Sequence, residues 1–161
     1  MSVKAEPIRR ILVPIDFSEG SEIAFQQAER LAVSTGATIV VLHAFELPDP
    51  WGVGGRIEEV DEKTKAKLRD IRSRVQGVNI ECLAHGGPAG NVICWEAQEN
   101  DIDLIVMGTH GRSGLSHLAM GSVAEYVMRH APCPVLTVRQ KKPNERPIEE
   151  PTVYVPMPPI M

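Results

Sequence analysis

The residues with the clearest capacity for chemistry are glycines that lie between positions 108 and 122. The sequence reads Gly-Thr-His-Gly-Arg-Ser-Gly from Gly108 to Gly114, and Gly121-Ser122 follows a short apolar stretch. Glycine permits positive φ and lets a ligand approach the main chain, and the N–H groups that open a helix are unpaired at its positive end. The segment therefore favours the binding of an anion such as phosphate, to which Arg112 would add a positive charge.

The same segment is also compatible with a purely structural role. Ser122 and Glu125 have the Ser-x-x-Glu spacing of a capping box, in which each side chain satisfies a backbone donor beside the other. Both roles can hold together, because the N–H groups of Gly121 and of the first helical turn can face a phosphate while Glu125 turns back along the helix. The residues alone leave both readings open.

Three well-known motifs are absent or incomplete in the sequence. There is no Gly-Lys-Ser or Gly-Lys-Thr pair, so the chain has no Walker A loop. The glycines from Gly52 to Gly55 do not complete a Gly-x-Gly-x-x-Gly fingerprint, because Ile57 fills its last place. Ser113 is not in a Gly-x-Ser-x-Gly nucleophile elbow, because position 115 is leucine.

An aspartate and two histidines follow or end the apolar runs. From its place after the first run, Asp16 can accept hydrogen bonds from a ribose hydroxyl or a base, or it can cap a helix before Ser18. His110 can polarise a phosphate or hold the shape of the loop, and His43 is expected to hydrogen-bond to nearby backbone. Neither histidine has a convincing catalytic partner in the sequence, so we predict no catalytic residue and no metal ligand.

These residues must be positioned by strands and helices that alternate along the chain. Short apolar and β-branched runs predict five strands, at Ile11–Ile15, Thr38–Ala44, Val78–Ala84, Asp103–Met107 and Pro134–Val138. Helical spacing predicts four helices, at Ser21–Thr35, at Ile57–Val75, from Pro88 through Ala97, and from near Gly121. The alternation predicts an α/β fold with an open parallel sheet, helices on both faces and a ligand site at the carboxyl ends of the strands.

Size and charge limit the classes of function. A chain of 161 residues suits one domain. Lys and Arg number 17 against 21 Asp and Glu, so no basic surplus favours nucleic acid. The residues from Met1 to Arg10 lack the apolar core of a secretory signal, and no apolar run approaches the ~20 residues that span a bilayer. We therefore expect a cytoplasmic protein that binds neither nucleic acid nor membrane.

The cysteines and the C-terminal segment point to little specialised chemistry. Cys82, Cys94 and Cys133 are odd in number and far apart, so we predict buried free thiols. The segment Gln140–Met161 holds six of the 13 prolines and is predicted to lie outside the core. The segment Phe45–Arg56 contains no motif that defines its role, and a lid over the ligand and a surface loop both suit its glycines.

The pattern Gly108-x2-Gly111-x9-Gly121-Ser122 resembles the nucleotide-binding signature of the universal stress protein family. The strands fit those of the family in order, and the resemblance covers about residues 8–139. It implies a five-stranded sheet of order 3-2-1-4-5, in the class described as adenine nucleotide alpha hydrolase-like. It also implies a nucleotide-binding domain over residues 1–139, followed by a Pro-rich tail over residues 140–161.

The resemblance further implies a ligand, a site and a partner. ATP, or ADP or AMP, would bind between strands one and four with Mg²⁺ carried by the phosphates. The implied contacts are Pro14, Ile15, Asp16 and Ala44 for adenine and ribose, Met107 and Gly108 for the nucleoside, and His110, Gly111, Arg112, Gly121, Ser122 and Val123 around the phosphates. A homodimer would form through strand five, Val135 to Val138, and the tail could cross to the other subunit with Thr152–Val155 as an added strand.

The function implied is that of a stress-response regulator whose conformation or partners respond to bound nucleotide, and not that of an enzyme. A slow ATP-hydrolysing enzyme is the first alternative, with His110 and Arg112 as the candidate residues. A nucleotide-independent interaction module that uses the tail is the second. The sequence defines neither the stress signal nor the regulatory partner.

Overall fold

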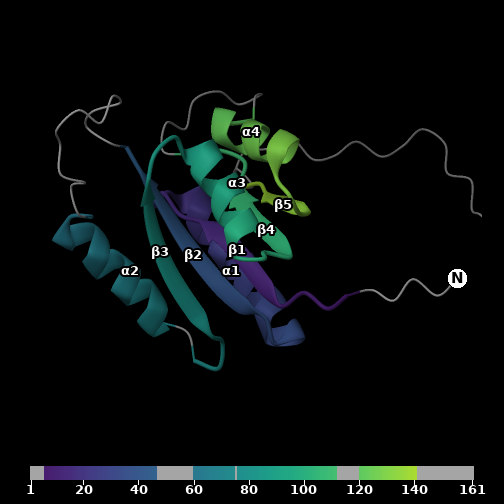
Figure 1. Cartoon of the computed structure of the whole chain (residues 1–161). Helices are drawn as coiled ribbons and strands as arrows, with labels where there is room; N and C mark the ends of the chain where they lie inside the picture. The colour runs from purple at the N-terminus through teal and green to yellow at the C-terminus, as the bar shows by residue number, and fades with distance from the viewer. Residues whose placement is uncertain (1–5, 47–59, 75, 112–119, 141–161) are drawn as a thin grey trace, which may run out of the picture.

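A computed structural model describes residues 6–46, 60–74, 76–111 and 120–140 of the chain. Strands and helices alternate strictly along these residues (Figure 1). The elements are β1 (Arg10–Pro14), α1 (Glu19–Thr35), β2 (Thr38–Phe45), α2 (Glu62–Arg74), β3 (Ile80–Gly86), α3 (Ala89–Glu99), β4 (Leu104–Gly108), α4 (Ser122–His130) and β5 (Val135–Val138).

The five strands form one parallel sheet in the order β3-β2-β1-β4-β5, which confirms the predicted fold and strand order. The strand β1 pairs with β2 from Arg10↔Thr38 to Pro14↔Leu42, and with β4 at Ile11↔Leu104 and Leu12↔Ile105. The order of the strands therefore reverses between β1 and β4. In open parallel sheets a ligand binds outside the carboxyl ends of the strands at such a point.

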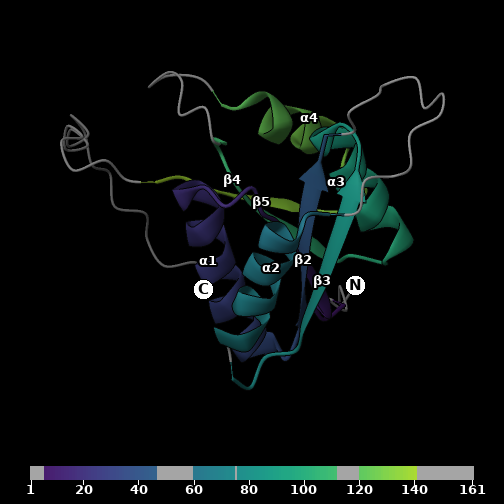
Figure 2. The ribbon, with the colours of Figure 1, turned by 90° about the vertical axis from the view of Figure 1, so that its left-hand side faces the viewer.

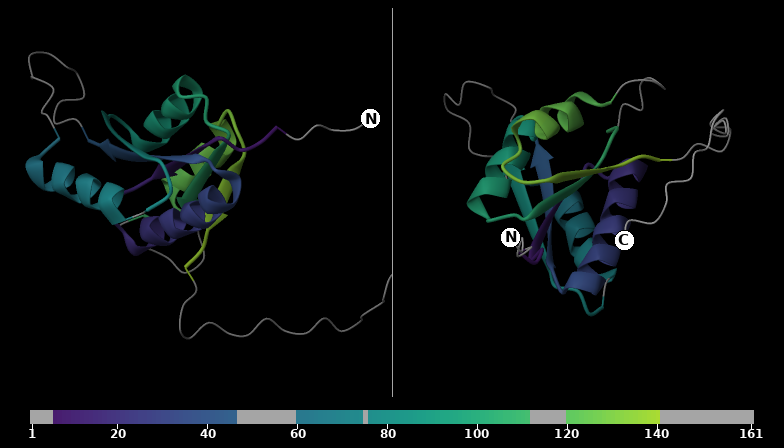
Figure 3. Two further views of the ribbon diagram at one scale, coloured as in Figure 1. Left: turned by 90° about the horizontal axis from the view of Figure 1, so that it is seen from below. Right: turned by 90° about the vertical axis from the view of Figure 1, so that its right-hand side faces the viewer.

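The helices cover the sheet in two layers. The helices α1 and α2 lie side by side on one face (Figure 2), and α3 and α4 cover the other (Figure 3). Because side chains alternate along a strand, Ile11 and Val13 join the core beneath α1 and α2, whereas Leu12 joins the core beneath α3 and α4. All three are fully buried, as expected of a strand that is covered on both faces.

The bounds of β1, α1, β2, β4 and β5 differ from the prediction by one or two residues, and those of α2, β3 and α3 differ in ways that matter for the fold. The helix α2 begins at Glu62 because Asp61 caps it: one carboxylate oxygen accepts the N–H of Thr64 and the other accepts its hydroxyl, both at 2.9 Å. These hydrogen bonds hold the pKa of Asp61 below its ordinary value. Residues 57–59 of the predicted helix lie outside the described residues. The strand β3 is shifted by two residues and ends at Gly86, and Pro88 is the N-cap of α3 rather than its first residue.

The three cysteines are free thiols, as predicted, but they are half-buried rather than buried. Burial raises the pKa of the Cys94 thiol, and burial together with the nearby charge of Asp103 raises the pKa of Cys133. A raised pKa means less thiolate at neutral pH, and the thiolate is the reactive form.

Among the described residues, no helix is both long and apolar enough to cross a bilayer.

We expect Cys94 and Cys133 to react with iodoacetamide more slowly than glutathione does at neutral pH, because less of each thiol is ionised. Both reaction rates should increase as the pH rises through the raised pKa values. Timed alkylation followed by mass spectrometry measures the rate at each cysteine. Rates equal to that of glutathione would contradict the expectation.

Candidate functional site

A cavity of about 390 Å³ opens at the carboxyl ends of β1, β2 and β4, between the first turns of α1, α3 and α4. This volume lies within the range of roughly 300 to 1,000 Å³ that is typical of small-molecule sites. Every predicted site residue that the structure describes lines the cavity. These residues are Pro14, Ile15, Asp16, Ala44, Met107, Gly108, His110, Gly111, Gly121, Ser122 and Val123. Arg112 lies outside the described residues.

The cavity also has lining residues that the sequence reasoning missed: Ser21, Leu42, Ala89, Ile93, Thr109 and Ala124. A signal for Leu42 existed, because it lies two residues before Ala44 and so shares its face of the strand. Ser21 and Ala89 belong to the first turns of helices that follow strands, where a site at the carboxyl ends of the strands is expected. Ile93 could be found only from the packing of α3 over the sheet.

One end of the cavity is apolar. It is lined by Leu42, Met107 and Ile93, which are almost fully buried in the core beneath α3 and α4, and by Ile15, which packs in the core beneath α1 and α2. A hydrogen bond of 2.8 Å from the Ile15 N–H to the Leu42 carbonyl oxygen continues the pairing of the chain with β2 beyond the end of β1. This end suits a flat, largely apolar group that is held between strand ends and α3.

Asp16 lies next to the apolar end and is the one carboxylate among the described lining residues. Its Oδ1 accepts a hydrogen bond of 2.9 Å from the Ser18 N–H, and Ser18 itself caps α1 by accepting the Ser21 N–H. The cap of α1 is therefore Ser18, and Asp16 supports that turn while it also lines the cavity. Its Oδ2 would lie 3.1 Å from a Cβ at Gly111, so the glycine loop approaches this carboxylate closely.

The other end of the cavity is formed by the glycine loop and the first turn of α4. The N–H of Gly121 donates to the Thr109 carbonyl oxygen at 2.7 Å, and the N–H of Thr109 donates to the Val138 carbonyl oxygen at 3.2 Å. The expectation that the Gly121 N–H faces a phosphate is therefore wrong, because this donor holds the loop against α4. The N–H groups of Ser122 and Val123 have no acceptor within the helix and remain to bind an anion.

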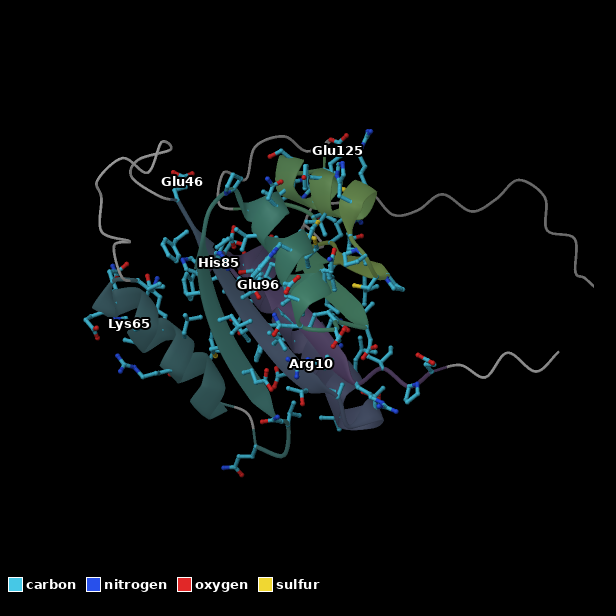
Figure 4. All side chains as sticks on the ribbon, in the orientation of Figure 1. Arg10, Glu46, Lys65, His85, Glu96 and Glu125 are labelled. Atoms are coloured by element: carbon cyan, nitrogen blue, oxygen red, sulfur yellow. The ribbon has the colours of Figure 1, made fainter. Side chains whose placement is uncertain are left out.

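The capping box is not formed. Gly121 is the N-cap of α4 and Ser122 is its first residue, so no side chain caps this helix. Glu125 instead accepts a hydrogen bond of 2.8 Å from Arg129 one turn later, and it lies on the outward side of α4 (Figure 4). The structural alternative for Ser122 is therefore excluded, and the start of α4 is left with donors for a ligand.

The helix α3, which forms one wall of the cavity, is fastened to the sheet by a polar cluster. The buried Glu96 accepts a hydrogen bond of 2.7 Å from the Asn100 side chain, and its Oε1 lies 2.7 Å from Nδ1 of His85 on β3 (Figure 4). Arg10 of β1 donates to the Asn100 carbonyl oxygen at 2.9 Å and pairs with Glu81 at 2.8 Å. This cluster fixes α3, and with it Ile93, over β1 and β3.

The distance between α3 and α4 is set by a glycine. A Cβ at Gly90 of α3 would lie 2.6 Å from Cδ1 and 2.9 Å from Cγ of Tyr126 on α4, so the tyrosine ring rests directly on the Gly90 backbone. The Tyr126 ring also stacks on His130, with 4.2 Å between the ring centroids. Because both helices line the cavity, this contact fixes the width of the cavity.

We expect Gly90→Ala to push α4 away from α3 and, for the nucleotide that the family resemblance implies, to lower the affinity by roughly tenfold, because the first turn of α4 moves with the helix. Isothermal titration calorimetry with ATP measures the affinity. The double variant Gly90→Ala/Tyr126→Ala restores the space and should recover most of the affinity. Failure of this second change to restore binding would show that Gly90 acts otherwise than through Tyr126.

The two histidines near the site have structural partners. His43 hydrogen-bonds through Nδ1 to the Ile15 carbonyl oxygen at 2.8 Å, which confirms the predicted bond to nearby backbone. His110 lines the cavity, and its Nδ1 lies 2.9 Å from the Thr109 hydroxyl. Among the described residues, no three His, Cys, Asp or Glu side chains group closely enough to hold a metal ion by themselves.

Comparison with known proteins gives one consistent result. The family model of the universal stress protein family matches residues 7–139. Universal stress protein MJ0531 of Methanocaldococcus jannaschii is 32% identical over 142 residues, which cover 83% of this chain and 84% of that protein. A universal stress protein of Thermus aquaticus is 35% identical over 136 residues, which cover 81% of this chain and 98% of that protein.

Solved structures share the fold. The structure of MJ0577 of Methanocaldococcus jannaschii superposes with a TM-score of 0.69 at 27% identity, and it covers 85% of this chain and 99% of its own. The universal stress protein from Archaeoglobus fulgidus in complex with dAMP superposes with a TM-score of 0.58 at 28% identity, and it covers 80% of this chain and 96% of its own. The family model spans most of this chain, so the protein belongs to the universal stress protein family.

Proposed function

We propose that this protein is an ATP-binding regulator of the stress response whose conformation or partners respond to the bound nucleotide. The observation that carries the proposal is the cavity itself, which is lined by apolar residues, a carboxylate and the first N–H groups of a helix. The apolar residues match the base of a nucleotide, the carboxylate matches the ribose, and the N–H groups match the phosphates. The complex of the Archaeoglobus fulgidus relative with dAMP supports an adenine nucleotide.

Each part of the nucleotide has partners in the cavity. The adenine lies at the apolar end, between the strand-end residues Ile15 and Ala44 and the side chain of Met107. The ribose hydroxyls donate to the Asp16 carboxylate, which is an acceptor when ionised. The phosphates accept from the N–H groups of Ser122 and Val123, where the positive end of the α4 dipole also stabilises negative charge.

Further proposals concern the phosphates and their cation. Gly111 lets them approach the backbone of the loop, Arg112 pairs with them, and Mg²⁺ binds to the phosphate oxygens. His110 is a neighbour of the phosphates and not a catalytic base, so hydrolysis is slow or absent. ADP and AMP fit the same site with fewer phosphate contacts.

We also propose that residues 1–139 form the nucleotide-binding domain, that residues 140–161 form a tail that follows β5, and that the protein is cytoplasmic.

The proposed homodimer forms through β5, Val135–Val138, with the tail reaching the other subunit. In the described part of the chain β5 is an edge strand, and its Leu136 is 41% exposed. An exposed apolar edge strand offers unpaired backbone groups to a second copy. Leu136→Lys tests this point, because it should turn a dimer into a monomer in sedimentation experiments.

The test of the proposed function is the identity and fate of the nucleotide. Gently purified protein should carry an adenine nucleotide that mass spectrometry identifies, and calorimetry on nucleotide-free protein should show ATP binding. A regulator is contradicted if the protein turns over ATP at about 1 per second or faster, as ordinary enzymes do, and if His110→Ala abolishes that turnover. An interaction module that uses the tail alone is indicated if neither experiment detects a nucleotide.

A further inference from the structure

Phe17 has an unusual backbone conformation beside the cavity. Its φ is 64°, in the left-handed region that bulky side chains rarely adopt. It lies between Asp16, which lines the cavity, and Ser18, which caps α1. A residue held in this region persists only where its surroundings enforce it, and such residues gather at binding sites. The contacts of the Phe17 side chain therefore help to fix the conformation of residues 16–18, which we call the cavity corner.

Two side chains from other elements contact the Phe17 ring. The ring of His43 on β2 lies 4.9 Å from it between centroids, tilted by 42°. The ammonium of Lys67 on α2 lies 4.6 Å from the centre of the Phe17 ring, within the range of a cation–π interaction. The Phe17 ring thus joins the cavity corner to α2, which itself does not line the cavity.

His43 extends this contact to the floor of the cavity. It is 6% exposed, and its Nδ1 hydrogen-bonds to the carbonyl oxygen of Ile15. Because side chains alternate along β2, His43 lies on the opposite face of the sheet from Leu42 and Ala44, which line the cavity. Ile15 and Phe17 pack in the core beneath α1 and α2, so contacts in the cavity with Ile15 and Asp16 are linked to the α2 layer through His43 and Phe17.

The helix α2 packs on the sheet through apolar side chains. Among its side chains whose burial is described, only those of Leu68 and Ile71 are buried. Its first turn is capped from within by Asp61, and its Lys65–Glu62 and Arg69–Glu62 pairs are internal to the helix. The contact of Lys67 with Phe17 ties this helix to the ligand-binding edge of the sheet, in addition to the hydrogen bond of 3.6 Å from the Cys82 thiol of β3 to the Leu68 carbonyl oxygen.

We infer that Phe17 and Lys67 are positioning residues that couple occupancy of the nucleotide site to the stability of α2. The inference rests on the proposed function. A nucleotide that binds Asp16 and Ile15 holds the corner in its left-handed conformation, which keeps the Phe17 ring beneath Lys67. By linkage, the factor by which nucleotide stabilises this contact equals the factor by which the contact raises nucleotide affinity. The helix α2 is then the element that a regulatory partner can read.

The experiment compares full-length Lys67→Gln, Lys67→Arg and wild type, with Lys63→Gln as the matched loss of one charge on the same helix. Calorimetry gives the affinity for ATP with Mg²⁺, and hydrogen exchange gives the protection of α2 amides with and without it. We expect ATP to raise α2 protection in the wild type. Lys67→Gln should lose that rise and bind ATP about two- to fivefold more weakly, which corresponds to the usual strength of an exposed cation–π contact.

Lys67→Arg keeps a cation over the ring and should behave as the wild type, and so should Lys63→Gln. Phe17→Leu removes the ring from the other side and should reproduce the loss seen with Lys67→Gln. Equal affinity and equal α2 protection in Lys67→Gln and wild type would overturn the inference while leaving the proposed function intact. A wild type that binds no ATP overturns both.

Discussion

Gly121→Val is expected to lower the affinity for ATP by about 100-fold or more. A Cβ at this position would lie 3.1 Å from the Thr109 carbonyl oxygen and 3.6 Å from the His110 Cα, and valine adds two methyl groups to it. The loop and the start of α4 must separate, so the 2.7 Å hydrogen bond between them is lost and the Ser122 and Val123 donors move. Hydrogen bonds to charged groups contribute about 1.5–3 kcal/mol each, and two such bonds give this magnitude. Calorimetry with ATP measures it.

The backbone at Gly121 does not itself demand glycine. Its φ of −62° and ψ of 148° are open to any residue, so Gly121→Val should still fold, with a smaller loss of stability from the displaced loop than of affinity for ATP. Gly36→Asn is the control: Gly36 ends α1 with φ 75° and has no other atoms near it, and asparagine tolerates that conformation. An unchanged affinity in Gly121→Val would place the phosphates elsewhere.

Gly108→Ala is expected to reduce both the stability of the fold and the affinity for ATP. A Cβ on Gly108 would lie 3.0 Å from the carbonyl carbon and oxygen of Gly20, and backbone atoms cannot turn away as a flexible side chain can. The end of β4 and the first turn of α1 must part, at a cost of about 1–3 kcal/mol in the free energy of unfolding. For a chain of this length the midpoint of thermal unfolding falls by roughly 2 to 12 °C. Thermal unfolding followed by circular dichroism measures the change.

Gly20→Ala examines a neighbouring contact between α1 and the glycine loop, because its Cβ would lie 3.0 Å from the His110 carbonyl oxygen. Alanine is a better helix former than glycine, so propensity alone would make this variant more stable. A fall in the thermal midpoint would therefore isolate the steric effect. If both variants are as stable as wild type, the close approach of α1 to the glycine loop does not constrain the protein.

Much of the fold could be predicted because its central strands are buried on both faces. Runs such as Ile11–Ile15 and Thr38–Ala44 leave few alternatives to a parallel sheet, and Gly36 marks the end of α1, which the structure reproduces with a φ of 75°. The position of the site followed from the carboxyl-end rule together with the glycine spacing. The strand order came from the family resemblance, since periodicity contains no information about neighbours in a sheet.

The remaining features depend on contacts between segments that are distant in sequence. The N–H of Gly121 is taken by Thr109 only because the loop folds back onto α4, so no local pattern distinguishes it from the donors at Ser122 and Val123. The Ser-x-x-Glu spacing left a capping box open as an alternative, but Glu125 pairs with Arg129 instead. Local propensity also extended the helix before Glu62, where the Asp61 cap starts it.

The cavity draws its lining residues from both halves of the chain. Asp16 and part of the apolar end come from residues 14–44, whereas Ile93, Met107, the loop and the start of α4 come from the second half. Neither half contains a complete site, so a nucleotide that fills the cavity binds only the fully assembled domain. Binding to the folded state alone adds RT ln(1 + [L]/Kd) to stability, about 2.7 kcal/mol at a ligand concentration 100 times Kd. The thermal midpoint of this protein should therefore rise with the concentration of free nucleotide. At a fixed temperature, the fraction of the protein that stays folded then reports that concentration.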